Sequence, residues 1–300
     1  MATTKQRRDY TRRLNAIIRE AAQASDATGR ALMLELNSLR LSVSELLQVP
    51  GAVDITGMTE LLAAIDQQIL ATSTRMGAIA ASGASEQWIL GAQSVHAPFI
   101  AAEVTAGAFI GVNTQQLIVL RGFTVDLITR LSDEMKDKIK TRIQIGALGG
   151  KSPFDIMRDV TDILGIKGGR EIVGGVASRA EGIVKTELGR VFSSATQAQL
   201  EQTAASVDDM RKRWLASGNR LMPRDAHIAE HMQTLAEPIP HDKPFMINGH
   251  ALMFPRDPSA PAGETIRCGC RHIAVHPDLG IISGPFDKAI EKQQQVRAEA

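Results

Sequence analysis

Apolar residues recur every three or four positions through most of the first 205 residues, which is the period of an amphipathic α-helix. Pro50-Gly51 and Ser152 fit a helix end and a helix start. Sustained alternation of the strand kind is absent from this part of the sequence. The pattern predicts helices over residues 14–21, 31–47, 59–76, 115–145 and 152–164, and from about 170 or 178 to 202.

The pattern changes at two places. Residues 77–111 are rich in Ala, Gly and Ser, which indicates closely packed helices or flexible connections. Residues 218–285 hold most of the prolines, six of the seven histidines and both cysteines, in short runs separated by turns. This composition predicts a small irregular α+β module, and modules of this size often need a bound metal for stability.

We therefore expect a mainly α protein, with a helical N-terminal body and a small C-terminal α+β module stapled by a metal. The expected regions are a helical N-terminal region, a second helical segment, the His/Cys module and a polar helical tail. They cover residues 1–140, 141–210, 211–285 and 286–300.

Composition narrows the class of partner. The formal net charge of +1 argues against a highly basic protein that binds polyanions through its overall charge. The aromatic content of 4% argues against a protein that binds single-stranded nucleic acid by stacking its bases on aromatic rings. Arg211-Lys212-Arg213 and an N-terminal cluster could still contact DNA phosphates. The N-terminal cluster consists of Lys5, Arg7, Arg8, Arg12, Arg13 and Arg19. Four of these, Arg7, Arg8, Arg12 and Arg13, interleave around a helix, which favours a solvated face or an acidic protein partner.

The cysteines and the N-terminus bear on the compartment. Cys268 and Cys270 are separated by one residue, a spacing that makes a poor disulfide, so a reducing compartment or a metal is expected. Neither a secretory leader nor a run long enough to cross a bilayer is apparent in the sequence. We expect a soluble protein, made in a cytoplasm and without a membrane partner.

The strongest candidate chemistry is a four-ligand metal site made of His227, His231, Cys268 and Cys270. Imidazoles four residues apart share one face of a helix, and thiolates and imidazoles are ligands that suit Zn²⁺. The alternative is that the histidines hydrogen-bond backbone carbonyls while the cysteines pack as small hydrophobic groups. P-loop, dinucleotide-binding and G-x-S-x-G motifs are absent from the sequence.

The same segment also matches the H-x-x-E-H pattern of a class of zinc proteases, with Glu230 as the base. Such a site needs a third ligand further along the chain, and only 69 residues follow His231. A metal-dependent hydrolase is therefore an alternative function, and a DNA-binding module is another.

Residues from about 145 to 275 resemble the phage Mu F-like head morphogenesis family of minor capsid proteins. Several separated motifs agree in order with that family. The departures are Gly269 at a place often taken by Arg, Met232 where Gly often follows the second His, and a Pro-rich insertion at 255–262. The matching motifs are Gly149-Gly150-Lys151-Ser152, Ile183-Val184-Lys185-Thr186-Glu187, Trp214, Arg224-Asp225-Ala226-His227 with His231, Asp242-Lys243-Pro244-Phe245 and Cys268-Gly269-Cys270-Arg271.

The resemblance implies a non-enzymatic minor virion protein that acts in head morphogenesis at or near the portal vertex. It implies assembly in the cytoplasm of a bacterial host and residence in the virion, in the capsid interior or at the portal. The implied partners are portal protein, other head proteins, phage DNA and further copies of the chain, with residues 1–140 as a contact region. Structural roles fall to Glu187, Trp214, Arg224 and Arg271, and Glu187 is expected to pair with one of these two arginines.

Overall fold

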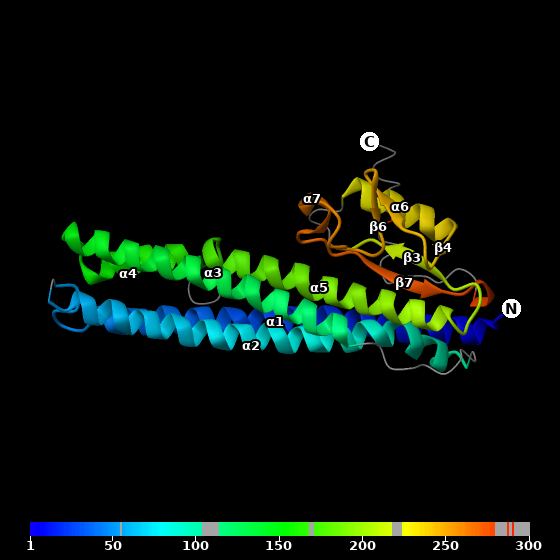
Figure 1. Ribbon diagram of the computed structural model, residues 1–300, viewed down its shortest axis with the longest axis horizontal. Helices are drawn as coiled ribbons and strands as arrows, with labels where there is room; N and C mark the ends of the chain where they lie inside the picture. The colour runs from blue at the N-terminus through cyan, green and yellow to red at the C-terminus, as the bar shows by residue number, and fades with distance from the viewer. Residues whose placement is uncertain are drawn as a thin grey trace. The chain divides into compact units, whose positions relative to one another are not determined.

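The computed structural model describes residues 1–54, 56–103, 114–167, 171–217 and 224–279, together with Asp287 and Ile290 (Figure 1). Long helices dominate it, which confirms the predicted mainly α class with small C-terminal sheets. The helices are α1 (Thr4–Leu47), α2 (Met58–Ala101), α3 (Gln115–Leu148), α4 (Pro153–Leu164), α5 (Gly175–Ala204), α6 (Asp225–Ala236), α7 (Ala262–Thr265) and the 3₁₀ turn η1 (Pro277–Leu279).

Two segments that lie outside the predicted helices belong to continuous helix. The predicted helices at 14–21 and 31–47 both belong to α1, because the interval holds no proline and the cost of Gly29 in a helix, about 1 kcal/mol, is tolerated. Residues 77–101, where the composition indicates either packed helices or flexible connections, continue α2. The rest of that segment and the expected cap at Asn113 lie outside the described residues, as does the predicted helical tail at 289–300 apart from Ile290.

The predicted start of α4 is confirmed. The Ser152 side chain accepts a hydrogen bond from the backbone N–H of Asp155 at 3.2 Å, and Pro153 occupies the first helical position. Gly165 follows the helix in the left-handed conformation, with φ of 71°. A short hairpin of β1 (Ile166–Lys167) and β2 (Glu171–Ile172) then leads into α5.

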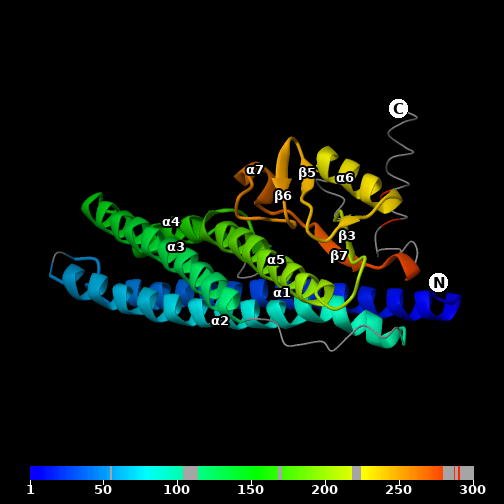
Figure 2. The ribbon, with the colours of Figure 1, turned by 45° about the vertical axis from the view of Figure 1, so that its right-hand side comes forward.

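The strands of the C-terminal region form two antiparallel sheets. The first has the order β4-β3-β7, with β3 (Arg211–Leu215) between β4 (Ile239–Pro240) and β7 (Arg271–Val275). The second is the hairpin of β5 (Phe245–Ile247) and β6 (His250–Leu252), which turns at Asn248-Gly249, both with positive φ. The helix α6 and this hairpin lie on the same side of β3 and β7 in both views (Figures 1 and 2).

The chain divides into two compact units that are discontinuous in sequence. Unit 1 comprises Met1–Ser25, Ala84–Leu120 and Lys185–Ala300, and unit 2 comprises Asp26–Gly83 and Arg121–Val184. The expected regions, by contrast, are contiguous segments. None of the described helices is long and apolar enough to cross a membrane.

Two of the hydrophobic clusters of unit 1 lie on opposite faces of the β4-β3-β7 sheet. One joins the sheet to the helices, as Leu215 and Ile273 pack with Leu14 and Phe99. The other is built on Trp214, which packs with residues of α6, the β5–β6 hairpin and the two cysteines. Because both faces are covered, β3 and β7 are almost completely buried, and the site residues lie inside a solid core.

Candidate metal centre

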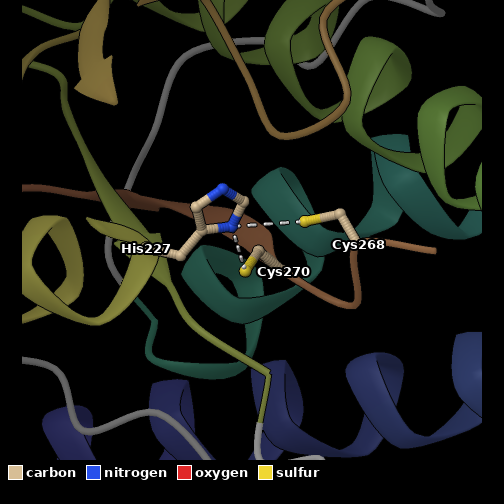
Figure 3. Close-up of side chains that lie close together, drawn as sticks. All are labelled: His227, Cys268 and Cys270. Carbon is tan, nitrogen blue, oxygen red and sulfur yellow. Dashed lines mark hydrogen bonds between the residues drawn. The ribbon is translucent and has the colours of Figure 1, made fainter. Parts of the chain in front are cut away.

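His227, Cys268 and Cys270 form one buried group (Figure 3). The first turn of α6 carries His227, and the two cysteines flank Gly269 just before β7. The Nδ1 atom of His227 lies 3.3 Å from Sγ of Cys270 and 3.5 Å from Sγ of Cys268. The three potential ligand atoms all lie within 4.8 Å of one another. This group could hold a metal ion such as zinc.

The spacing of these atoms fits tetrahedral zinc. Zinc bonds of about 2.0 Å to imidazole nitrogen and about 2.3 Å to thiolate sulfur place neighbouring ligands roughly 3.6 Å apart. The two nitrogen–sulfur distances of 3.3 and 3.5 Å are close to that value. One nitrogen and two sulfurs also make a donor set that zinc prefers over hard cations. The donors present therefore suit the metal that the sequence predicts.

Glu264 orients the ring of His227. Its Oε2 lies 2.8 Å from Nε2 of His227, while its Oε1 accepts a hydrogen bond from the Asn248 side chain at 2.8 Å. A carboxylate on the far nitrogen of a metal-binding histidine fixes the tautomer and leaves the near nitrogen free to coordinate. The sequence motifs did not reveal Glu264, because it stands outside any regular spacing with the other ligands.

The pKa shifts at this group favour a thiolate at Cys268 beside a protonated thiol at Cys270. The hydrogen bond with Cys270 is the largest influence on the pKa of Cys268 and lowers it well below the usual value, with His227 and Arg256 adding to the effect. The same hydrogen bond, together with burial, raises the pKa of Cys270. Burial alone would lower the pKa of His227, but Cys268 and Glu264 outweigh it and raise that pKa. A metal cation would take the place of the protons that this group shares.

His231, the fourth expected ligand, lies outside the group. Its Nδ1 accepts a hydrogen bond from the backbone N–H of Ala216 at 3.2 Å, and its Nε2 lies 3.5 Å from a carboxylate oxygen of Asp287. Burial and the nearby Arg213 lower the pKa of His231 to about 4, so its ring is neutral at pH 7. The structure thus brings together three of the four predicted ligands, and His231 serves the packing of β3 against α6.

The H-x-x-E-H pattern does not form a joint site in the described structure. Its two histidines face different partners, and Glu230 is buried with an exposed fraction of 5%. Burial raises the pKa of Glu230, although a hydrogen bond from the backbone of Met246 opposes the shift. The geometry that a zinc-bound water and a carboxylate base require is therefore missing among these residues.

A buried arginine supports the cysteine-bearing segment. Nε of Arg256 donates to the backbone carbonyl of Cys268 at 2.6 Å, and the side chain is fully enclosed. Gly189 of α5 makes room for it, since a Cβ at that position would lie 2.3 Å from Cζ of Arg256. Arg256 belongs to the segment that looked like a Pro-rich insertion, so sequence reasoning missed its role.

The Thr-Glu pair on α5 contacts the same segment. Thr186 accepts a hydrogen bond from the backbone N–H of Arg267 at 2.9 Å. Glu187 forms a buried ion pair with Arg190, whose Nε donates to the backbone carbonyl of Arg256 at 2.9 Å. The expected pairing of Glu187 with Arg224 or Arg271 is wrong, because Glu187 pairs with Arg190, which stands one helical turn further along α5.

The remaining predicted residues surround the group in other ways. Trp214 is fully buried and meets the ring of His227 edge-on at 5.4 Å. Arg224 donates to the carbonyls of Glu264 and Ile266 at 2.8 and 2.7 Å, which holds the turn that precedes the cysteines. Arg271 stacks on Phe192 of α5, with Cζ 4.1 Å from the ring centre. All four expected structural residues therefore lie in or beside this core.

The second basic cluster of the sequence is not a surface feature. Lys212 and Arg213 have exposed fractions of 0% and 1%. Arg213 forms an ion pair with Asp287 at 2.7 Å, and Lys212 donates to the Met253 carbonyl at 2.7 Å. Burial of these two side chains leaves them no surface for contacts with DNA phosphates.

Comparison with curated proteins finds a distant similarity to the NAD(+)–arginine ADP-ribosyltransferase EFV of Enterococcus faecalis, with 27% identity over 143 residues. The matched segment is 48% of this chain and 26% of that protein, so the chain spans about a quarter of its relative. No family model matches the sequence. No solved structure matches it either.

Proposed function

We propose that the chain is a structural component of a phage head, of the kind that the Mu F-like minor capsid proteins represent. One observation carries the proposal: motif residues far apart in the sequence meet around a single buried group. These residues come from three separate segments: Thr186 on α5, Arg224 and His227 at the start of α6, and Cys268 before β7. His227 contacts Cys268 directly, while Thr186 and Arg224 hydrogen-bond the turn at residues 264–267 that precedes it. Chance matches to separate short motifs have no reason to meet in space.

The arrangement favours a structural centre over a catalytic one. The group is enclosed, with exposed fractions of 2% for His227, 5% for Cys268 and 4% for Cys270. A cavity of about 480 Å³ in unit 1 is lined by parts of α3, α5 and the turn at Met253-Phe254, and its lining includes none of the three ligands. A catalytic centre must be reached by its substrate, and the three buried side chains offer a substrate no access.

In this proposal zinc acts as a staple. His227, Cys268 and Cys270 would hold it, Glu264 would fix the imidazole, and Arg256 would fix the cysteine-bearing turn. The ion supplies bonds that join α6 to the segment before β7. A buffered zinc titration followed by elemental analysis should find about one zinc per chain, and Cys268→Ser/Cys270→Ser should abolish it.

The similarity to an ADP-ribosyltransferase raises an enzymatic alternative. The matched segment makes up about a quarter of the protein that bears that name. Its activity is therefore not part of our proposal for this chain. The assay is incubation of the full chain with labelled NAD⁺ and an arginine-containing acceptor. We expect no transfer of label, and transfer above the rate of a boiled sample would overturn the non-enzymatic proposal.

The role in the head is tested in the phage or prophage that encodes the chain. Mass spectrometry should detect the polypeptide in purified particles, and deletion of its gene should reduce the yield of filled heads. The cysteine double variant should share this defect, whereas Ala22→Ser/Ala27→Ser, at two exposed positions, should not. Filled heads at normal yield from the deletion strain would contradict the proposal.

A further inference from the structure

The first half of α1 carries an exposed row of basic side chains. Lys5, Arg8, Arg12 and Arg19 follow one another at spacings of three, four and seven residues, and all four are exposed. These spacings return to one side of an α-helix. The row spans about 21 Å at about 1.5 Å per residue. The sequence alone indicated interleaved cations, but this subset forms a single stripe.

Packing holds the row toward solvent. Arg8 and Arg12 each stand two residues from Tyr10, and Arg19 stands two residues after Ile17. Two residues rotate about 200° around a helix, so the row lies opposite these side chains. Tyr10 and Ile17 are both completely buried, and the Tyr10 hydroxyl donates to the Ala274 carbonyl at 2.6 Å. The helix cannot rotate the cations inward without breaking this core.

The charge of the row is weakly neutralised. Arg12 meets Asp9 at 3.1 Å and Lys5 meets Glu103 at 3.9 Å, and the two cationic side chains remain 74% and 68% exposed. Exposed pairs of this kind contribute less than about 1 kcal/mol. Among the residues that the structure describes, neither Arg8 nor Arg19 has an ion-pair partner. Residues 1–25 contain six cations and two carboxylates.

We propose that this face of α1 binds the phosphate backbone of double-stranded nucleic acid. A straight, rigid row of cations matches a straight polyanion, and duplex DNA presents about one phosphate per 1.7 Å of axis, or roughly a dozen over this length. The large apolar side chains of this stretch are buried in the core, so the face that carries the row has none that would insert into a membrane. The aromatic ring of this segment, Tyr10, is buried, so stacking on single-stranded bases has no platform here. The inference does not depend on the proposed function.

The test measures binding of the full chain to a 30-base-pair DNA duplex by fluorescence anisotropy at several salt concentrations. Four phosphate contacts predict that log K falls with log salt at a slope of about −3.6. Replacing all four cations of the row by Gln should weaken binding at least tenfold in 50 mM salt and remove most of the slope. The matched control removes four exposed cations from α3, as Arg121→Gln/Arg130→Gln/Lys138→Gln/Arg142→Gln, and should bind like the wild type.

Three outcomes would overturn the proposal. The first is absence of duplex binding at 50 mM salt, and the second is an equal loss of affinity in the α3 control, which would assign binding to total charge. The third is tighter binding to phosphatidylserine vesicles or to polyglutamate than to the duplex, which would assign the face to a membrane or an acidic protein. Circular dichroism of each variant verifies that the helices are retained.

Discussion

Glu264 tests the metal centre at the scale of one residue, because it contacts the ligand His227 without being a ligand itself. Loss of such a carboxylate typically lowers metal affinity 10- to 100-fold. We therefore expect Glu264→Gln to weaken zinc binding by about this factor, as measured by competition with a chromophoric chelator. Glu237→Gln, the same change at an exposed position, should leave affinity unchanged. Equal affinities for both variants would show that Glu264 does not support a metal ligand.

Lys212 makes a second prediction, which concerns pH. Burial lowers its pKa from 10.5 to about 8, and the opposing effects of Glu201, Asp242 and Asp257 are smaller. Between those two pH values the unfolded chain binds more protons than the folded one, so stability rises with pH. Below pH 8 the charged amine costs the fold about 3 kcal/mol relative to the unfolded chain. His272, which Lys212 also influences, titrates below this range.

The comparison is with Lys212→Met, which lacks the titrating amine. The free energy of unfolding should be measured in urea at pH 7, 8.5 and 10. From pH 7 to pH 10 it should rise by about 2–3 kcal/mol more for the wild type than for the variant, because the other titrating groups are common to both proteins. A constant difference between the two proteins at all three values would mean that the amine is solvated in the folded state.

At the scale of single residues, the sequence could identify candidate ligands but not the direction in which their side chains point. The Cys-x-Cys pair and His227 stand out by residue type and spacing, and they do come together. His231 shares a helix face with His227, yet side-chain packing turns its ring toward Ala216. Glu264 and Arg256 carry no spacing signal, because the turns that bring them to the centre depend on tertiary contacts. Lys212, which reads as a surface cation, is buried by strands on both sides.

At the scale of elements, the close crossing of α2 and α5 in unit 1 depends on Gly91. A Cβ at this position would lie 2.3 Å from the backbone carbonyl oxygen of Phe192, which cannot move without shifting α5. Gly91→Ala should therefore destabilise the protein by about 1–3 kcal/mol, as overpacking does. Gly122→Ala on α3, where no neighbour lies within 4 Å, should stabilise it by up to about 1 kcal/mol. Chemical denaturation measures both, and a stabilising effect at Gly91 would contradict the close packing.

Helices were the predictable elements because apolar periodicity is a local property of the sequence. The boundaries of α4 followed from the cap at Ser152 and the glycine at its end. The length of α1 could not be predicted in this way. Residues 22–30 are polar enough to suggest a break, but the helix continues through them. Strands β3 and β7 do not alternate between apolar and polar residues because both of their faces are buried, so the sequence has no period of two that would predict them.

At the scale of the molecule, the first hydrophobic cluster of unit 1 changes how a metal staple should act. The sequence suggested a separate C-terminal module that folds on its metal. The structure instead packs β7 against α1 and α2 through residues such as Tyr10, Phe99 and Val275. A continuous core favours one cooperative transition for these segments, because no part can unfold without exposing the others.

Hydrogen exchange followed by mass spectrometry can distinguish the two cases. Zinc at 100 times its dissociation constant should stabilise the folded state by about 2.7 kcal/mol, and a chelator should remove this. We expect chelation to raise exchange together in peptides from residues 10–21, 85–101 and 211–217, although only the last adjoins the metal ligands in the fold. The Cys268→Ser/Cys270→Ser variant should show the faster exchange without chelator and no response to zinc. Faster exchange confined to residues 211–279 would mean that the C-terminal region unfolds by itself, and that the cluster around Tyr10 does not couple it to the helices.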